Sequence, residues 1–250
     1  MWRSTRYGRS KRWKREPLAV DFCILIRNFT LFRKGFGLCI QLLDILGMTV
    51  PTDDYDRTQR DLVCDTLDSL WMAEHALLRG YENQALSLLR RAYETTSLMA
   101  FFVNYPTEAA EWQNGKKIPQ VEIRKKLETA AFREPKENLD EMYRIYSLFT
   151  HVNRETVYHR MLGEGNHLTL GAQGNTGDVG VGSILRELLR QMMWFVDVAN
   201  FTFAKLGLKP TKQYVDEMLA YRNQVQNLAK KLPALFTEFP KTGPSASPVR

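Results

Sequence analysis

The sequence predicts an all-α helical bundle that carries one glycine-rich loop or short β-hairpin. Apolar residues recur at every third or fourth position through most of the chain, as on the buried face of amphipathic helices. Capping residues, glycines and prolines divide these stretches into segments of ordinary helix length. Seven of the 15 glycines lie in 163–182, too many for a helix interior. We expect one bundle domain over 17–236, between a basic arm at 1–16 and a disordered tail at 237–250.

The first half of the chain divides into three long helices. Pro17 opens a helical pattern that reaches about Gly47, and Gly35 and Gly37 are the places where this helix could bend. Turn and N-cap residues at 51–56 start a second helix, which ends at Gly80. Because only a short connection precedes the third helix, these two helices should form an antiparallel hairpin that ends near residue 104. The residues expected on the buried side of the second helix are Leu62, Leu67, Leu70, Trp71, Leu77 and Leu78.

Shorter helices are expected in the second half. Residues 106–112 and 119–131 have helical patterns, and Asn138 caps a helix that leads toward His151. The glycine-rich excursion at 163–182 includes a candidate strand at 167–170, and its part 171–182 is expected to be a mobile surface loop. Two further amphipathic helices are expected at 183–206 and 211–232.

The net charge of +7 comes entirely from the N-terminal arm. Its first 15 residues contain seven cations and no acid, and the remaining 235 residues hold 28 basic and 28 acidic side chains. The body therefore lacks the composition of a nucleic-acid-binding protein, whereas the arm has it. The arm cations that would contact nucleic acid are Arg3, Arg6, Arg9, Lys11, Arg12, Lys14 and Arg15.

The aromatic residues of the arm leave its role open. Trp2, Tyr7 and Trp13 alternate with the cations and would stack on bases or lie at a lipid interface. The alternatives are a solvated disordered tail, a start codon assigned too early, and an Arg-rich organellar transit peptide.

The remaining composition predicts a cytoplasmic protein without a membrane span. No run of 18 apolar residues occurs, and the apolar stretch 18–26 is interrupted by Asp21, which makes it a poor signal-peptide core. The three cysteines are Cys23, Cys39 and Cys64; they are far apart and are expected to be core residues in a reducing compartment. No metal site and no cofactor are expected.

The third expected helix carries an isolated pair of charges. Arg90 and Glu94 lie one turn apart on a stripe flanked by apolar residues, which should be partly covered. A covered charge is tolerated only when it is paired and hydrogen-bonded. The pair is either an i,i+4 ion pair that fixes helix packing, or a pair in which Glu94 or Arg90 orients a catalytic group or ligand.

The segment 143–159 is the richest in candidate catalytic groups. It holds His151, Arg154 and His159 within nine residues, and histidine is the side chain best suited to proton transfer near neutral pH. In a continuous helix Arg144 and His151 share one face, whereas Arg154 and His159 are separated unless the helix kinks near 150–152. The other interpretation is that these are surface or capping residues after a helix end.

These stretches together carry a resemblance. Residues 88–96, 109–112 and 143–153 resemble a widespread family of mostly uncharacterised bacterial helical proteins, similar in architecture to HEPN domains. Members have an R-x3-E helix followed by a Tyr-x-x-Leu-Ser-x-x-x-His helix. The resemblance covers roughly residues 60–160.

The match differs between the two motifs. Arg90 and Glu94 fit the first, and Tyr143 or Tyr146, with Ser147 and His151, fit the second approximately. Arg154–His159 and Arg144–His151 also have spacings within the R-x4–6-H signature of HEPN ribonucleases. Glu155 stands where that signature usually has a neutral polar residue after the arginine.

The resemblance implies a dimeric, metal-independent endoribonuclease or RNA-binding protein of a bacterial stress or defence system. His151 or His159 would move the proton, Arg154 or Arg144 would hold the phosphate, and Glu94 would orient the histidine. The competing class is a non-enzymatic module that binds a protein partner through the same bundle. A protein anchored to a membrane surface by its arm is a further alternative.

Overall fold

The computed structural model describes residues 22–127, 139, 140, 142–144, 146, 147 and 177–230. Within these residues the regular elements are all α-helices, so the predicted all-α bundle is confirmed. The long helices are α1 (Phe22–Gly47), α2 (Asp54–Leu78), α3 (Glu82–Asn104), α8 (Gly177–Lys205) and α9 (Lys212–Ala229). The shorter helices are α4 (Pro106–Gln113) and α5 (Gln120–Leu127). The arm, the tail and the candidate strand lie outside the described residues.

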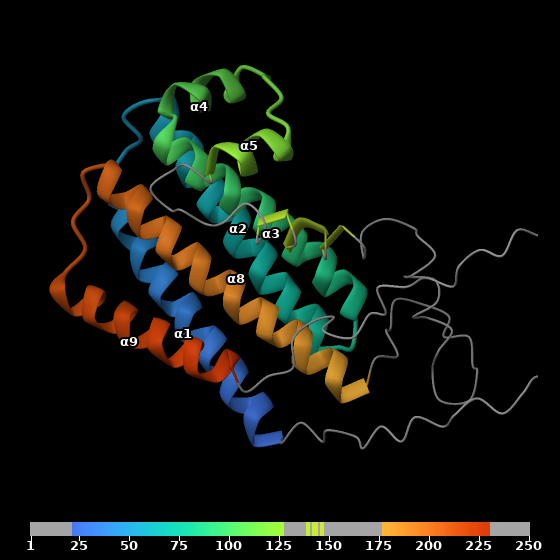
Figure 1. Cartoon of the computed structure of the whole chain (residues 1–250). Coiled ribbons are helices and arrows are strands. Elements are labelled where there is room, and N and C mark those ends of the chain that lie inside the picture. The colour runs from blue at the N-terminus through green and yellow to red at the C-terminus, as the bar shows by residue number, and fades with distance from the viewer. Residues whose placement is uncertain (1–21, 128–138, 141, 145, 148–176, 231–250) are drawn as a thin grey trace, which may run out of the picture.

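Helix α8 lies at the centre of the bundle (Figure 1). It packs against α1, α2, α3 and α9, and most of its residues between 182 and 199 are buried. A buried amide on this helix is satisfied across the core, because Gln191 donates through Nε2 to the Ala92 carbonyl and to Thr96 Oγ1, at 3.3 and 3.1 Å. The core is therefore assembled around a helix whose buried Gln191 is matched by α3.

Helices α2 and α3 form the predicted hairpin. Gly80 lies in the connection with φ of +77°, a backbone conformation that glycine adopts without steric cost. Across the hairpin, Thr66 Oγ1 bonds Thr95 Oγ1 at 2.8 Å, and Gln59 donates to the Met99 carbonyl at 3.3 Å. These contacts align the two helices over several turns.

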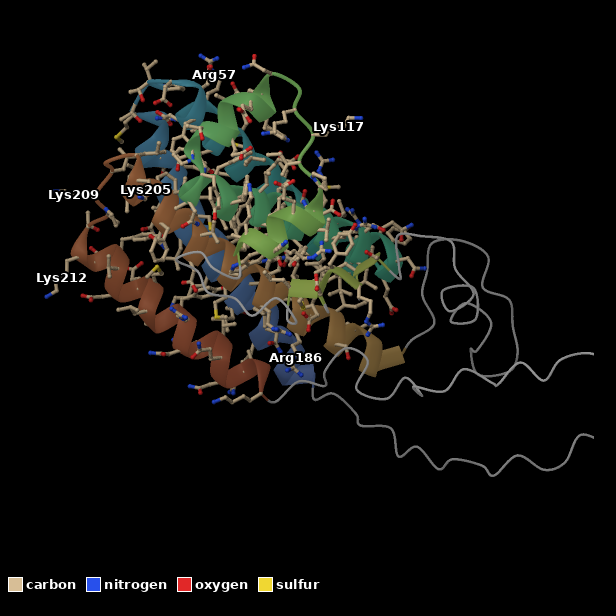
Figure 2. All side chains as sticks on the ribbon, turned by 45° about the horizontal axis from the view of Figure 1, so that its top comes forward. Arg57, Lys117, Arg186, Lys205, Lys209 and Lys212 are labelled. Atoms are coloured by element: carbon tan, nitrogen blue, oxygen red, sulfur yellow. The ribbon has the colours of Figure 1, made fainter. Side chains whose placement is uncertain are left out.

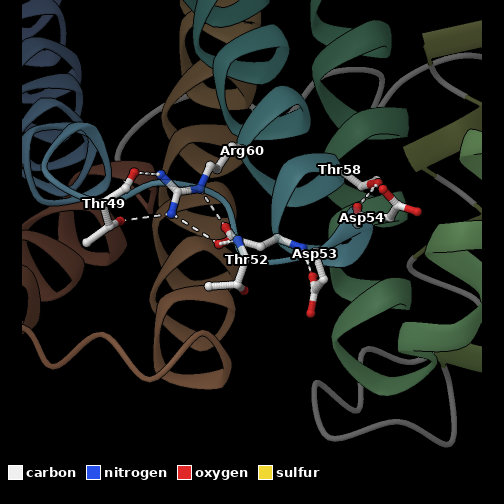
Figure 3. A network of polar contacts seen from close by, with 7 residues as sticks. Thr49, Thr52, Asp53, Asp54, Thr58 and Arg60 are labelled. Atoms are coloured by element: carbon white, nitrogen blue, oxygen red, sulfur yellow. Dashed lines mark hydrogen bonds and ion pairs between the residues drawn. The ribbon is translucent and has the colours of Figure 1, made fainter.

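The connection from α1 to α2 is held by a polar network (Figure 3). Asp53 caps α2 by accepting a bond from the Asp56 backbone N–H at 2.7 Å, as the residues at 51–56 predicted. Arg60 pairs with Asp56 and donates to the carbonyl and hydroxyl oxygens of Thr49, both at 2.8 Å. The turn is thus tied to the helix that it precedes.

Three details of the sequence prediction are wrong. Helix α8 begins at Gly177 rather than 183, because packing of the partly buried Val181 and the buried Gly182 against the core offsets the helix penalty of the glycines. Trp71 and Leu78 are 37 and 50% exposed, since α1 covers only part of that face of α2. Cys64 is exposed, whereas Cys39 is buried as expected. Helix α1 runs through Gly35 and Gly37 as one helix.

No described helix combines the length and the apolar character that a membrane span requires.

At Gly35, side chains of α8 and α9 pack tightly against α1, which gives a test of this packing. A Cβ at this position would lie 2.6 Å from Tyr221 Cζ and 2.7 Å from Met192 Cγ. We expect Gly35→Ala to lower the free energy of unfolding by about 1–3 kcal/mol through overpacking. The matched control is Gly37→Ala in the same helix, whose Cβ meets nothing within 4 Å; it should raise stability by about 0.5–1 kcal/mol. If urea unfolding gave the same change in the free energy of unfolding for both variants, the close packing at Gly35 would be contradicted.

Candidate functional site

The candidate site is organised around the helical residues of segment 139–147, in which 141 and 145 are not described. This segment contains Tyr143 and Tyr146, the two tyrosines of the second motif. Tyr143 contacts side chains of α3 and α5, whereas Tyr146 contacts the Tyr93 ring of α3 and lies near charges of α8. Segment 139–147 therefore connects three helices of the bundle.

The predicted pair on α3 is formed and is bound to this segment. Arg90 Nε donates to Glu94 Oε1 at 2.8 Å, and Arg90 Nη2 donates to Tyr143 Oη at 3.1 Å. The side chains of Arg90 and Glu94 are 16 and 31% exposed. Two motifs that are about fifty residues apart in the sequence are thus in direct contact. The guanidinium of Arg90 also lies 5.1 Å from the centre of the Tyr143 ring.

A second guanidinium binds the same tyrosine from α5. Arg124 lies 4.1 Å from the centre of the Tyr143 ring, and its Nε donates to Asp140 Oδ1 at 2.7 Å. The Arg124 side chain is only 9% exposed. We name these five residues the Tyr143 cluster: Arg90, Glu94, Arg124, Asp140 and Tyr143. Its two cations and two anions balance, so the cluster adds no net charge to the site.

The opposite side of segment 139–147 is held by aromatic contacts. Tyr93 donates its hydroxyl to the Leu139 carbonyl at 2.8 Å. Its ring centre is 5.7 Å from that of Tyr146 and 5.4 Å from that of Trp194 on α8. Tyr146 is fully buried. Burial and the nearby charge of Glu187 raise the pKa of its hydroxyl well above the ordinary value, so this hydroxyl stays protonated at neutral pH.

Glu187 is a buried acid that the sequence analysis did not single out. It is 3% exposed on α8, and Arg190 Nη1 lies 3.2 Å from its Oε1 and 3.5 Å from its Oε2. Burial raises the pKa of this carboxyl, while the charges of Arg190 and Arg186 lower it, and the net direction is upward. The signal that could have identified it is the run of charges at 186–190 within an otherwise apolar helix.

The structure describes three of the six predicted catalytic residues. Arg90 and Glu94 are partly covered and paired, and Arg144 is exposed on segment 139–147. His151, Arg154 and His159 lie outside the described residues, as do the seven cations of the arm. Among the described residues no three His, Cys, Asp or Glu side chains gather as ligands for a metal ion.

The arrangement defines what each described residue can do chemically. Arg90 and Arg124 are engaged with Tyr143 and neighbouring carboxylates, so their main effect is to position segment 139–147. Arg144 follows Tyr143 directly and is an exposed residue, and an arginine can bind a phosphate group. The partly exposed Glu94 carboxylate can orient a hydrogen-bond donor at the surface.

Substitution of Tyr143 separates its hydrogen bond from its ring contacts. We expect Tyr143→Phe to lower the free energy of unfolding by about 1 kcal/mol, because the hydroxyl no longer accepts from Arg90. Tyr143→Leu should cost about 1 kcal/mol more, because both guanidiniums also lose the ring face. Equilibrium denaturation of the three proteins measures this order, and equal stability of the Phe and Leu variants would contradict the two ring contacts.

The raised pKa of Glu187 predicts a pH-dependent stability. The native state holds this proton to a higher pH than the unfolded chain, whose carboxyl has the ordinary value of 4.5. Stability should therefore fall as the pH rises above about 4.5 toward the folded-state pKa. Urea unfolding across this pH range should show that the free energy of unfolding falls less for Glu187→Gln than for the unsubstituted protein. Parallel pH profiles would show that Glu187 is not responsible.

The two sides of segment 139–147 thus differ in chemistry. One faces the charge-balanced Tyr143 cluster, and the other faces the buried aromatic rings and Glu187. Comparison of the chain with protein-family models, curated proteins and solved structures finds no match.

Proposed function

We propose that this chain is a HEPN-like RNA-binding protein that cleaves RNA without a metal ion, using His151 or His159 together with Arg144 or Arg154. The observation that carries the proposal is the hydrogen bond between Arg90 and Tyr143, which brings the R-x3-E motif into contact with the Tyr/Ser/His motif. Members of the family that this chain resembles carry both motifs. We further propose a cytoplasmic homodimer of a bacterial stress or defence system.

The position of Arg144 supports a role at the phosphate. It neighbours Tyr143, whose two guanidinium contacts fix the backbone at this point, and its side chain is exposed. A positioned guanidinium stabilises the charge that develops on a phosphate as its bond breaks. His151 follows Ser147 by four residues in the sequence. The segment therefore supplies the anion-binding group and the histidine from one stretch of chain.

The reaction needs few groups. The histidine takes the proton of the ribose 2′-hydroxyl, and the resulting oxygen forms a bond to phosphorus as the bond to the 5′ oxygen breaks. The protonated histidine then gives a proton to the departing 5′ oxygen, which leaves a 2′,3′-cyclic phosphate and a 5′-hydroxyl end. Arg144 or Arg154 holds the phosphate oxygens, and Glu94 orients the histidine.

Cleavage of a mixed RNA pool in EDTA tests the proposal. We expect His151→Ala or His159→Ala to lower the cleavage rate by about 100-fold or more, the usual contribution of general acid–base catalysis. The matched control is His75→Gln, because His75 lies on α2 beside Trp71 and belongs to neither motif. Equal cleavage by all four proteins would indicate a contaminating nuclease. Absence of both cleavage and RNA binding would contradict the proposal.

An interaction module is the second candidate, and one observation favours it. Ile40, Trp71 and Met72 on α1 and α2 are 44, 37 and 52% exposed, and Phe36 packs its ring on Trp71 at 4.9 Å. Exposed apolar groups on adjoining helices are common where proteins bind one another. In this function the Arg90–Glu94 pair would only stabilise the bundle. A protein that self-associates in sedimentation yet neither binds nor cleaves RNA is the result expected for this candidate.

A further inference from the structure

A groove of about 440 Å³ runs between α1 and α9, away from the Tyr143 cluster. It is lined by Arg27, Thr30, Leu31, Lys34, Gln224, Asn227 and Leu228. One end of the groove lies beside the close contact between Gly35 and Tyr221. Lys34, which lines the groove, is the residue before Gly35, and Gln224 is about one helical turn after Tyr221. Leu31 and Leu228 supply apolar side chains, and the polar residues of the lining are exposed.

The charge of this groove is positive. Arg27 and Lys34 line it, and no carboxylate does. The nearest cations on the same helices are paired elsewhere: Arg33 binds Glu74 on α2 at 2.9 Å, and Arg222 lies 3.7 Å from Asp197 on α8. Within the described part of the chain, neither Arg27 nor Lys34 forms an ion pair or hydrogen bond. Two cations therefore face a shared groove without an anion among the described residues.

The α9 side of the groove offers hydrogen bonds. Gln224 and Asn227 are both exposed, and neither side chain bonds another described residue. Amides accept and donate, so they can bind phosphate oxygens, ribose hydroxyls or base edges. A groove with cations on one wall and amides on the other matches the chemistry of a phosphate ester with polar substituents.

The spacing of the two cations favours a strand over a single phosphate group. Arg27 and Lys34 are seven residues apart on α1, which corresponds to a rise of about 10 Å along the helix axis. We propose that this groove binds two phosphates of one single-stranded RNA and is a second contact surface, separate from the Tyr143 cluster. This inference rests on the proposed RNA function. The groove would bind the part of the RNA strand that lies away from the bond that is cleaved.

Fluorescence anisotropy with a short labelled single-stranded oligoribonucleotide tests the proposal. The groove variant is Arg27→Gln/Lys34→Gln. The matched control is Lys205→Gln/Lys212→Gln, which removes two exposed charges at the turn between α8 and α9, at the opposite end of α9 (Figure 2). Because all four side chains are exposed, both variants should fold, as thermal unfolding will verify. A third variant, Gln224→Leu/Asn227→Leu, removes the amides without changing the charge.

We expect the groove variant to weaken binding about tenfold and to reduce the slope of log K against log salt by about 1.4, or about 0.7 for each lost phosphate contact. The control should change affinity less than about twofold, within the effect of long-range charge. The amide variant should weaken binding without altering the salt slope, because no cation is lost.

Three results would overturn the proposal, and they are distinguishable. Equal losses in the groove and control variants would show that only net charge matters, while the proposed RNA function would stand. Oligonucleotide binding that the groove variant keeps in full, together with AMP binding that the groove variant loses, would identify a small phosphate ester as the ligand of the groove. No binding of RNA by the unsubstituted protein would overturn the proposed function together with this inference.

Discussion

The structure depends on the burial of α8 among α1, α2, α3 and α9. A helix covered on most sides gains stability from apolar contact, and every polar group on it requires a partner. Gln191 finds one in the backbone and side chain of α3, and Glu187 finds one in Arg190. The same requirement explains why Arg90 of α3 and Glu187 of α8 lie near segment 139–147, where a tyrosine hydroxyl, a ring face or an opposite charge is within reach.

Helical periodicity and capping chemistry predicted most of the fold. Asp53 caps α2 and Gly80 ends the first arm of the hairpin because both effects act within a few residues of sequence. The errors arose where distant contacts decide the outcome. Burial extends α8 through glycines that favour a loop on their own, and the partial cover from α1 leaves Trp71 exposed although its spacing is that of a core residue.

The candidate site was predictable to the extent that it is local. Arg90 and Glu94 are one helical turn apart, so their ion pair follows from the sequence. Tyr143 was part of the predicted motif, but its two cations come from α3 and α5, and only the packing of three helices brings them to one ring. Arg124 and Asp140 were missed for this reason, since 16 residues separate them. Glu187 has its partner Arg190 one helical turn away, but only the packing of α8 shows that this carboxylate is buried.

The pairing of α1 with α9 has a consequence for the order of folding. Gly35 and Tyr221 meet although almost the whole described chain separates them, and closing so long a loop costs far more entropy than forming the α2–α3 hairpin. The hairpin can therefore form early, whereas the α1–α9 contact must await nearly the complete chain. A ligand held between these two helices would bind only the finished fold, and its binding energy would add directly to the stability of the whole bundle.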